Sequence, residues 1–245
     1  MPTPTKIKAP LTKITRFADD VFKLDFAVER KYTRFKPGQF LHLTLEDFDP
    51  TQAYWPESRV FSICSAPKTN TLSIIYSVKG AYTTRMRDEL VEGGEYWLKL
   101  PYGDFIIEQL LPEGETAVLV AGGTGISPYV SYLEQGLENG FGRHVHLAYA
   151  VRSPERLSFD DLLSRTRTTE TFTQRVWCET DGAEDNGIIT DSGPLDLDSV
   201  VADVANFPSP HYLLSGPPGM LATFSSKLKT DHGVDEQFIH IDEWE

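Results

Sequence analysis

The sequence has few cysteines, no long apolar run and a deficit of basic residues. Cys64 and Cys178 are too few for a disulfide framework, or for the four thiolates that an iron–sulfur cluster normally takes. No apolar run reaches the ~20 residues that span a bilayer. Residues 1–6 also lack the apolar segment of a secretory signal. These absences predict a protein of a reducing, cytoplasmic setting with no metal centre and no membrane span.

The charge is unevenly distributed along the chain. The net charge of −13 opposes binding to nucleic acid, which is itself a polyanion. Residues 1–115 hold 15 basic and 16 acidic side chains, whereas the rest of the 245 residues hold 8 and 20. This change coincides with a Pro-, Gly- and Glu-containing linker at 111–115. We therefore predict two domains, residues 1–112 and 113–245.

The first domain has the pattern of an antiparallel β-barrel. Short runs rich in β-branched and aromatic residues alternate with turn residues such as Pro37-Gly38 and Gly93-Gly94. The expected strands are residues 11–17, 21–28, 39–45, 60–64, 72–78 and 95–100, with one helix near 84–90. Residues 46–58 are expected to form a long loop.

The second domain alternates strands with helices, as an α/β, Rossmann-like parallel sheet does. Its expected strands are residues 116–120, 144–150, 172–179, 211–214 and 237–241. Its expected helices are residues 127–138, 158–165, 198–206 and 219–230. Ligands of such sheets bind beyond the carboxyl ends of the strands.

A glycine turn follows the first of these strands. Gly122, Gly123 and Gly125 allow positive φ and close approach of a ligand, and Ser127 is expected to cap the next helix. Free N–H groups and the helix dipole then converge on one point, which suits a phosphate or pyrophosphate.

Four stretches, in this order, resemble the ferredoxin–NADP reductase superfamily: RVFSICS at 59–65, GAYTTRM at 80–86, GGTGISP at 122–128 and SGPPGM at 215–220. The resemblance implies a flavin-binding antiparallel β-barrel followed by an NAD(P)-binding α/β domain. It also implies that hydride passes from NAD(P)H to the flavin.

The first stretch resembles the flavin motif of that family. By this resemblance Arg59 binds a flavin phosphate, and Phe61 takes the place of a tyrosine that stacks on the isoalloxazine ring. Ser62 is placed near the reactive edge of the flavin as a catalytic positioning group, and Ser65 completes the motif.

The second stretch resembles the family's pyrophosphate turn at a helix start. There Gly80 would allow the turn, and Thr83 and Thr84 would bind the flavin pyrophosphate. A pyrophosphate site favours FAD over FMN, which has a single phosphate.

The last two stretches resemble the nicotinamide-nucleotide site. The implied cofactor-binding residues are Gly123, Thr124, Gly125, Ser215, Gly216 and Pro217. Ser215 stands where the family has a cysteine close to the hydride-transfer carbon, and it is the second expected catalytic positioning group.

Two further residues have implied roles. Arg152 follows the second strand of the nucleotide domain, where a 2′-phosphate would lie, but Glu179 and Asp191 nearby favour NADH, so the nucleotide is written NAD(P)H. Trp244 resembles the terminal aromatic residue that shields the flavin in some family members. It would equally suit an edge strand.

The predicted function is a flavoprotein oxidoreductase that passes electrons to a separate acceptor such as a ferredoxin or flavodoxin. One alternative is a free flavin or ferric reductase. Another is a flavin-binding electron-transfer subunit that acts only in a complex.

Overall fold

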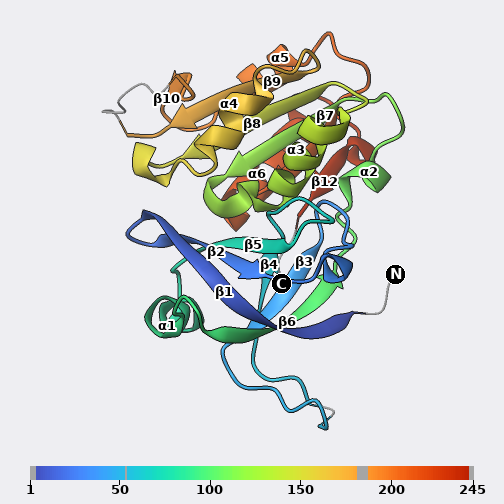
Figure 1. Ribbon diagram of the computed structural model, residues 1–245. Coiled ribbons are helices and arrows are strands. Elements are labelled where there is room, and N and C mark those ends of the chain that lie inside the picture. Colours follow the sequence, from blue (N-terminus) through green and yellow to red (C-terminus); the bar gives the residue numbers. More distant parts are fainter. Residues whose placement is uncertain (1–3, 53, 181–186, 243–245) are drawn as a thin grey trace. The chain divides into compact units, whose positions relative to one another are not determined.

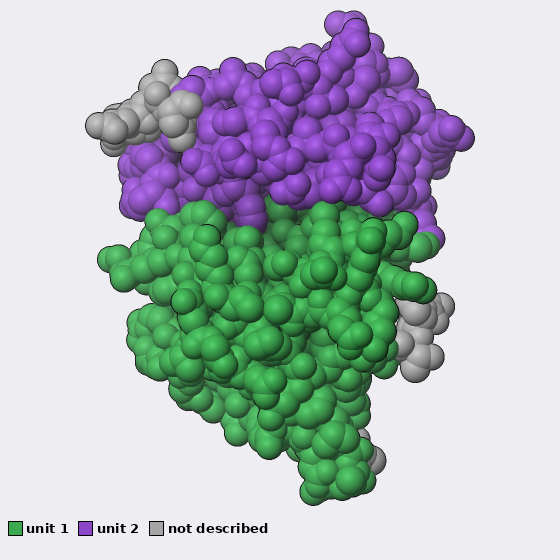
Figure 2. Space-filling view, viewed as in Figure 1, with its two compact units in different colours: residues 1–106, 127–132 green, residues 107–126, 133–245 purple. Residues whose placement is uncertain are grey.

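The computed structural model describes residues 4–52, 54–180 and 187–242. The chain divides into two compact units, which Figure 2 colours separately. Unit 1 comprises Met1–Ile106 and Ser127–Tyr132, and unit 2 comprises Ile107–Ile126 and Leu133–Glu245. The domain boundary after residue 112 stays a prediction.

Unit 1 contains a six-stranded antiparallel sheet in the order β4-β3-β6-β1-β2-β5. Its strands are β1 (Thr5–Ala18), β2 (Val21–Ala27), β3 (Phe40–Thr44), β4 (Arg59–Ser62), β5 (Thr71–Ser77) and β6 (Glu95–Tyr102). The two end strands, β4 and β5, lie close to each other. The N–H of Cys64, just after β4, donates to the carbonyl of Ser73 in β5 over 2.9 Å. The sheet is thereby nearly closed into a barrel, which confirms the predicted fold class.

Strand β1 is longer than predicted because it serves two neighbours. Thr5–Pro10 pairs with β6, and the strand from Leu11 onward pairs with β2. Ile7, Ala9 and Leu11 alternate inward and are buried in the barrel core. The lysines and Pro10 between them hide this alternation in the sequence. The helix α1 (Ala81–Glu89) contributes the buried residues Tyr82 and Met86 to the same core.

Unit 2 contains a parallel six-stranded sheet in the order β10-β9-β8-β7-β11-β12 (Figure 1). Its strands are β7 (Ala117–Gly122), β8 (Val145–Val151), β9 (Phe172–Cys178), β10 (Asp191–Ser192), β11 (His211–Ser215) and β12 (Ile239–Ile241). All residues of β7 are buried, as expected for a strand covered on both faces.

The helices of unit 2 are α2 (Ile107–Leu110), α3 (Ser127–Asn139, whose first half belongs to unit 1), α4 (Asp160–Thr166), α5 (Leu197–Asp203) and α6 (Pro218–Thr230). Buried residues of α5 and α6 pack with Val118, Val120 and Leu214 against one face of the sheet. The right-handed crossovers that parallel strands adopt put α3 and α4 on the other face. In the part of the chain that the structure describes, no helix has both the length and the apolar character to cross a membrane.

The strand order defines a topological switch point in the middle of this sheet. From β7 the chain proceeds through β8 and β9 on one side, then returns to place β11 on the other side of β7. The connection from β7 to β8 and the connection from β11 to β12 therefore run in opposite directions along the sheet, and they start side by side at the carboxyl ends of β7 and β11. Such a crevice is where ligands bind in open parallel sheets.

A buried histidine lies inside this sheet. His146 of β8 is 3% exposed, and its Nδ1 lies 2.9 Å from Thr173 Oγ1. Burial lowers the pKa of His146 to about 4; Arg175 acts in the same direction and Asp203 opposes it. The folded protein therefore resists protonation of a side chain that is readily protonated in the unfolded chain.

This difference predicts a loss of stability in mild acid. Well above pH 6.5 the imidazole is neutral in both states, whereas between pH 6.5 and about pH 4 it is mainly the unfolded chain that takes up the proton. We expect about 2 kcal/mol of the free energy of unfolding to be lost between pH 7 and pH 5 through His146. Urea unfolding followed by circular dichroism should show this loss shrinking in His146→Gln. The exposed His144→Gln is the control, and equal pH profiles for the two variants would contradict the assignment.

Candidate functional site

Arg59 is the first residue of β4, and its side chain lies over the ring of Tyr82 in α1. Its guanidinium lies 4.5 Å from the centre of the Tyr82 ring, donates to the Ser58 carbonyl over 2.9 Å and contacts Glu57 over 3.0 Å. The Arg59 side chain is 48% exposed, and ion pairs at such positions contribute only about 0–1 kcal/mol. A phosphate could therefore replace Glu57 at little cost.

Phe61 and Ser62 follow on the same strand. Phe61 is half-buried and lies edge-on to Tyr76, with ring centres 6.1 Å apart. Ser62 is 3% exposed, and its hydroxyl has no hydrogen-bond partner among the described residues. An unsatisfied buried hydroxyl costs about 1–3 kcal/mol. A polar group of a bound flavin would satisfy Ser62, so these residues fit the cofactor that the sequence predicts.

The start of α1 differs in detail from the sequence prediction. The Thr83 hydroxyl accepts the backbone N–H groups of Lys79 over 2.9 Å and Gly80 over 3.1 Å, so it holds the turn itself. Gly80 has extended backbone at φ −163°, which any residue can adopt. The groups that this leaves available to a phosphate at the start of α1 are Thr84 and the first N–H groups of the helix.

The glycine turn lies at the switch point of unit 2. Gly123 has φ +56° and begins a short 3-10 turn, Gly123–Ile126, that runs directly into α3. The expectation that Ser127 caps this helix is wrong, because Ile126 holds the capping position in helical conformation and Ser127 is already inside the helix. The continuous turn leaves no room for a separate capping residue.

The turn after β11 packs directly on this glycine turn. A Cβ at Gly125 would lie 2.4 Å from the Ser215 carbonyl oxygen, and a Cβ at Gly122 would lie 2.9 Å from Pro217. Gly216 has φ +157° and lies against the backbone of Gly122. The structure thus brings together the two sequence-predicted nucleotide turns, backbone against backbone, at the carboxyl ends of β7 and β11.

Asp242 lies beside Ser215 at the end of β11, and the sequence did not predict a role for it. It directly follows β12 and is 5% exposed, and its carboxylate accepts the Ser215 hydroxyl over 3.0 Å. Nothing in the local pattern distinguishes it from the other acidic residues near the end of the chain. The parallel pairing of β11 with β12 is what aligns the two side chains.

Polar residues cluster after β8, where Arg152 is exposed. The Ser153 hydroxyl donates to the Glu155 carboxylate over 2.6 Å, and this hydrogen bond is the main cause of the lowered pKa of Glu155. The N–H of Thr180 donates to the Arg152 carbonyl over 3.1 Å. The segments that follow β8 and β9 are therefore tied together beside Arg152.

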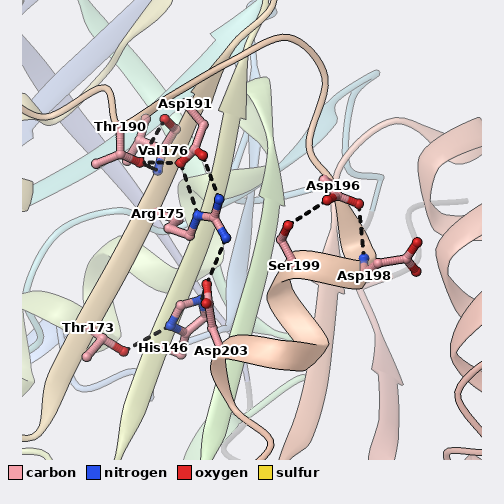
Figure 3. Close-up of polar contacts among 10 residues, drawn as sticks. All are labelled: His146, Thr173, Arg175, Val176, Thr190, Asp191, Asp196, Asp198, Ser199 and Asp203. Atoms are coloured by element: carbon pink, nitrogen blue, oxygen red, sulfur yellow. Dashed lines mark hydrogen bonds and ion pairs between the residues drawn. The ribbon is translucent and has the colours of Figure 1, made fainter.

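The guanidinium of Arg175 in β9 forms ion pairs with acidic side chains (Figure 3). Its guanidinium makes two bonds to Asp191, at 2.6 and 3.0 Å, and one to Asp203 at 3.2 Å. These bonds raise the pKa of Arg175, Asp191 being the largest cause. With two carboxylates already bound, Arg175 is poorly suited to bind a nucleotide phosphate.

Trp244 lies outside the described residues, so its predicted place beside the flavin stays a prediction. Within residues 4–52, 54–180 and 187–242, no group of three or more His, Cys, Asp or Glu side chains is arranged to hold a metal ion.

Comparison with known proteins gives matches to both halves of the chain. A model of an FAD-binding domain matches residues 6–128, and a model of an oxidoreductase NAD-binding domain matches residues 119–226. The reductase component of propane 2-monooxygenase from Rhodococcus jostii is 30% identical over 175 residues, 68% of this chain and 44% of that protein. The gamma subunit of sulfhydrogenase 2 from Pyrococcus furiosus is 30% identical over 56% of this chain and 44% of that protein. The chain thus spans less than half the length of these relatives.

Solved structures share the whole fold. A ferredoxin–NADP⁺ reductase from Neisseria gonorrhoeae, with bound FAD and NADP, has a TM-score of 0.75 at 21% sequence identity. The matched region covers 97% of this chain and 98% of the reductase chain. The cytochrome P450 reductase GcoB of Amycolatopsis has a TM-score of 0.77 at 20% sequence identity. The matched region covers 98% of this chain and 70% of the GcoB chain. The chain belongs to the ferredoxin–NADP reductase superfamily and combines an FAD-binding domain with a nicotinamide-nucleotide-binding domain.

Proposed function

We propose that the protein takes hydride from NAD(P)H onto bound FAD and delivers electrons to a separate redox partner. The observation that carries this proposal is the buried, unsatisfied Ser62 hydroxyl beside Arg59 and Phe61, in a chain that also carries the paired glycine and Ser215 turns. Bound FAD would accept hydride and release its electrons to an acceptor.

The residues of β4 and α1 bind and orient the flavin. Arg59 pairs with a flavin phosphate, and the N-terminus of α1 with Thr84 binds the pyrophosphate. Phe61 offers its ring face to the isoalloxazine, and Ser62 donates a hydrogen bond at the ring edge. Ser65 is engaged within the barrel and not with the flavin, because its hydroxyl accepts the N–H of Ser73 in β5 over 3.1 Å.

The turns of unit 2 bind the dinucleotide. The N–H groups of Gly123, Thr124 and Gly125 face its pyrophosphate at the start of α3. The Ser215 turn, with Gly216 and Pro217, positions the nicotinamide. The exposed Arg152 lies on the side of β8 where the adenosine ribose would extend.

The names of the relatives support a separate electron acceptor. Reductase components of propane 2-monooxygenase and of terephthalate 1,2-dioxygenase are among them. We therefore propose a ferredoxin, a flavodoxin or an oxygenase component as the partner. The similarity to the sulfhydrogenase gamma subunit supports a second candidate, an electron-transfer subunit that works only in a complex.

Anaerobic visible spectra of the purified protein test the reaction. We expect a flavin absorption band that bleaches on addition of NADH or NADPH, and the nucleotide that bleaches it faster is the natural donor. A protein that takes up neither FAD nor FMN would overturn the proposal. A flavin that is reduced, but cannot pass electrons to any soluble acceptor, would favour the subunit function.

Ser62→Ala tests the flavin site separately. Loss of one hydrogen bond should weaken FAD binding by roughly threefold to tenfold, while the flavin-free protein becomes no less stable because an unsatisfied hydroxyl is removed. Ser131→Ala is the matched control, since its hydroxyl is also buried without a partner among the described residues. Fluorescence titration with FAD would measure both, and equal affinities would contradict the role of Ser62.

Gly125→Ala tests the nucleotide turn. The new methyl group would meet the Ser215 backbone, which must shift, so we expect dinucleotide affinity to fall at least tenfold and the melting temperature to drop. Gly219→Ala is the control, because a Cβ there meets nothing within 4 Å. If both variants bind NADH and NADPH as the wild type does, the turn is not the nucleotide site.

A further inference from the structure

Strand β1 changes its neighbour at Pro10. Before this residue β1 pairs with β6, and from Leu11 onward it pairs with β2. Successive residues of a strand direct their backbone N–H and C=O groups to opposite edges. Leu11 bonds to Gly93 and Gly94 on the β6 side, so Pro10 faces β2, where a proline has no N–H to donate. The ladder between β1 and β2 therefore ends at Leu11.

The same alternation leaves one edge of β1 free over residues 6–8. The backbone groups of Ile7 and Ala9 point to β6, as those of Leu11 do. Those of Lys6 and Lys8 consequently point to the opposite edge, where β2 is no longer paired with β1. Among the described residues, no loop or turn backbone group bonds to Lys6 or Lys8. We call this unpaired stretch of β1 the free edge.

An open groove of about 530 Å³ lies beside the free edge. Its lining includes four residues with apolar surface and two charged residues: Ile7, Ala27, Val28 and Tyr32, with Lys8 and Glu29. The Glu29 carboxylate already has a partner, because the Lys31 ammonium lies 3.0 Å from it. The groove thus offers an extended chain both backbone hydrogen-bonding groups and apolar surface.

The side chains of the free edge indicate which chain would fit. Lys6 and Lys8 are exposed, whereas Ile7 between them points inward and is buried. Lys8 forms an exposed ion pair with Asp47 at 3.3 Å, and Lys6 lies 4.3 Å from the centre of the Phe48 ring with no ion-pair partner among the described residues. Residues opposite each other in neighbouring strands share a face, where opposite charges are favourable and like charges are not. An added strand would therefore place acidic side chains beside the lysines and apolar side chains toward the groove.

We propose that the free edge of β1 binds an extended segment of another protein, in which acidic and apolar residues alternate, as an added β-strand. Backbone hydrogen bonds supply the affinity in this kind of recognition, and alternate side chains supply the specificity. The lysines also oppose a second copy of this chain as the occupant, because a two-fold antiparallel contact would set lysines against lysines. The free edge and the groove lie within unit 1, and the inference does not depend on the flavin reaction.

Fluorescence anisotropy with labelled octapeptides and the full chain tests the binding. A peptide of alternating Glu and Val should bind roughly tenfold more tightly than four Glu followed by four Val, because only alternation puts the acidic side chains on one face. An alternating Lys and Val peptide should bind as weakly as the block peptide, because like charges then face each other. Equal affinities for the three peptides would overturn the inference.

Lys8→Pro tests the backbone contact. It removes one N–H from the free edge, and Pro10 shows that β1 accepts proline two residues further along the same edge. We expect the alternating Glu and Val peptide to bind roughly threefold to tenfold more weakly, the effect of one lost hydrogen bond. Lys8→Gln keeps the N–H and removes only the charge, so its loss should stay below about threefold. Lys13→Gln removes an equal charge from the half of β1 that pairs with β2, and it should bind the peptide as the wild type does.

Two results with these variants would overturn the inference. Equal affinities for Lys8→Pro and Lys8→Gln would mean that the peptide does not use the backbone of the free edge. A dimer of the wild type that Lys8→Pro dissociates in sedimentation experiments would make a second copy the occupant. If Lys8→Pro does not fold, hydrogen exchange of the wild type decides the matter. Bound peptide should slow exchange of the Lys6 and Lys8 amides but not of the Ile7 and Ala9 amides, which already face β6, and unchanged exchange at Lys6 and Lys8 would refute strand addition.

Discussion

The close packing of two backbone turns is the constraint on which the nucleotide-binding unit depends. Gly125 approaches the Ser215 carbonyl so closely that a single methyl group would not fit. This contact requires β7 and β11 to be neighbours in register, with Ser215 opposite Ala121. That pairing in turn requires the chain to switch sides of the sheet after β10. The topology, the positions of the glycines and the proposed nucleotide site therefore depend on one another.

The barrel unit contains a buried polar group that the packing of its described residues does not satisfy. Its core is filled by alternating strand residues, yet Ser62 is buried with an unsatisfied hydroxyl among the described residues. Stability alone would favour an apolar side chain at this position. A flavin bound beside Ser62 would supply the missing hydrogen bond, and the match of residues 6–128 to an FAD-binding domain agrees with that proposal.

The sequence was sufficient to predict both sheets, because periodicity and turn residues are local properties. The alternation after residue 116 predicted β7, β8, β9 and β11 closely, and the four motifs predicted the family. What it could not supply came from non-local contacts. The first half of β1 is ordered by β6, about 90 residues away, and Asp242 meets Ser215 only because β12 pairs with β11. The local pattern also misassigned Ser127, since the 3-10 turn before α3 depends on the backbone of Gly123.

The serine at position 215 and the aspartate at position 242 explain each other. A thiol is a weak hydrogen-bond donor, whereas a hydroxyl donates well to a carboxylate. The Asp242 carboxylate is therefore better matched to serine than to the cysteine that the family resemblance leads one to expect. Conversely, a serine without Asp242 would lose the acceptor that its hydroxyl proton has in this structure. The departure from the family pattern is thus half of a pair, and its other half lies at the far end of the chain, where only the folded sheet shows it.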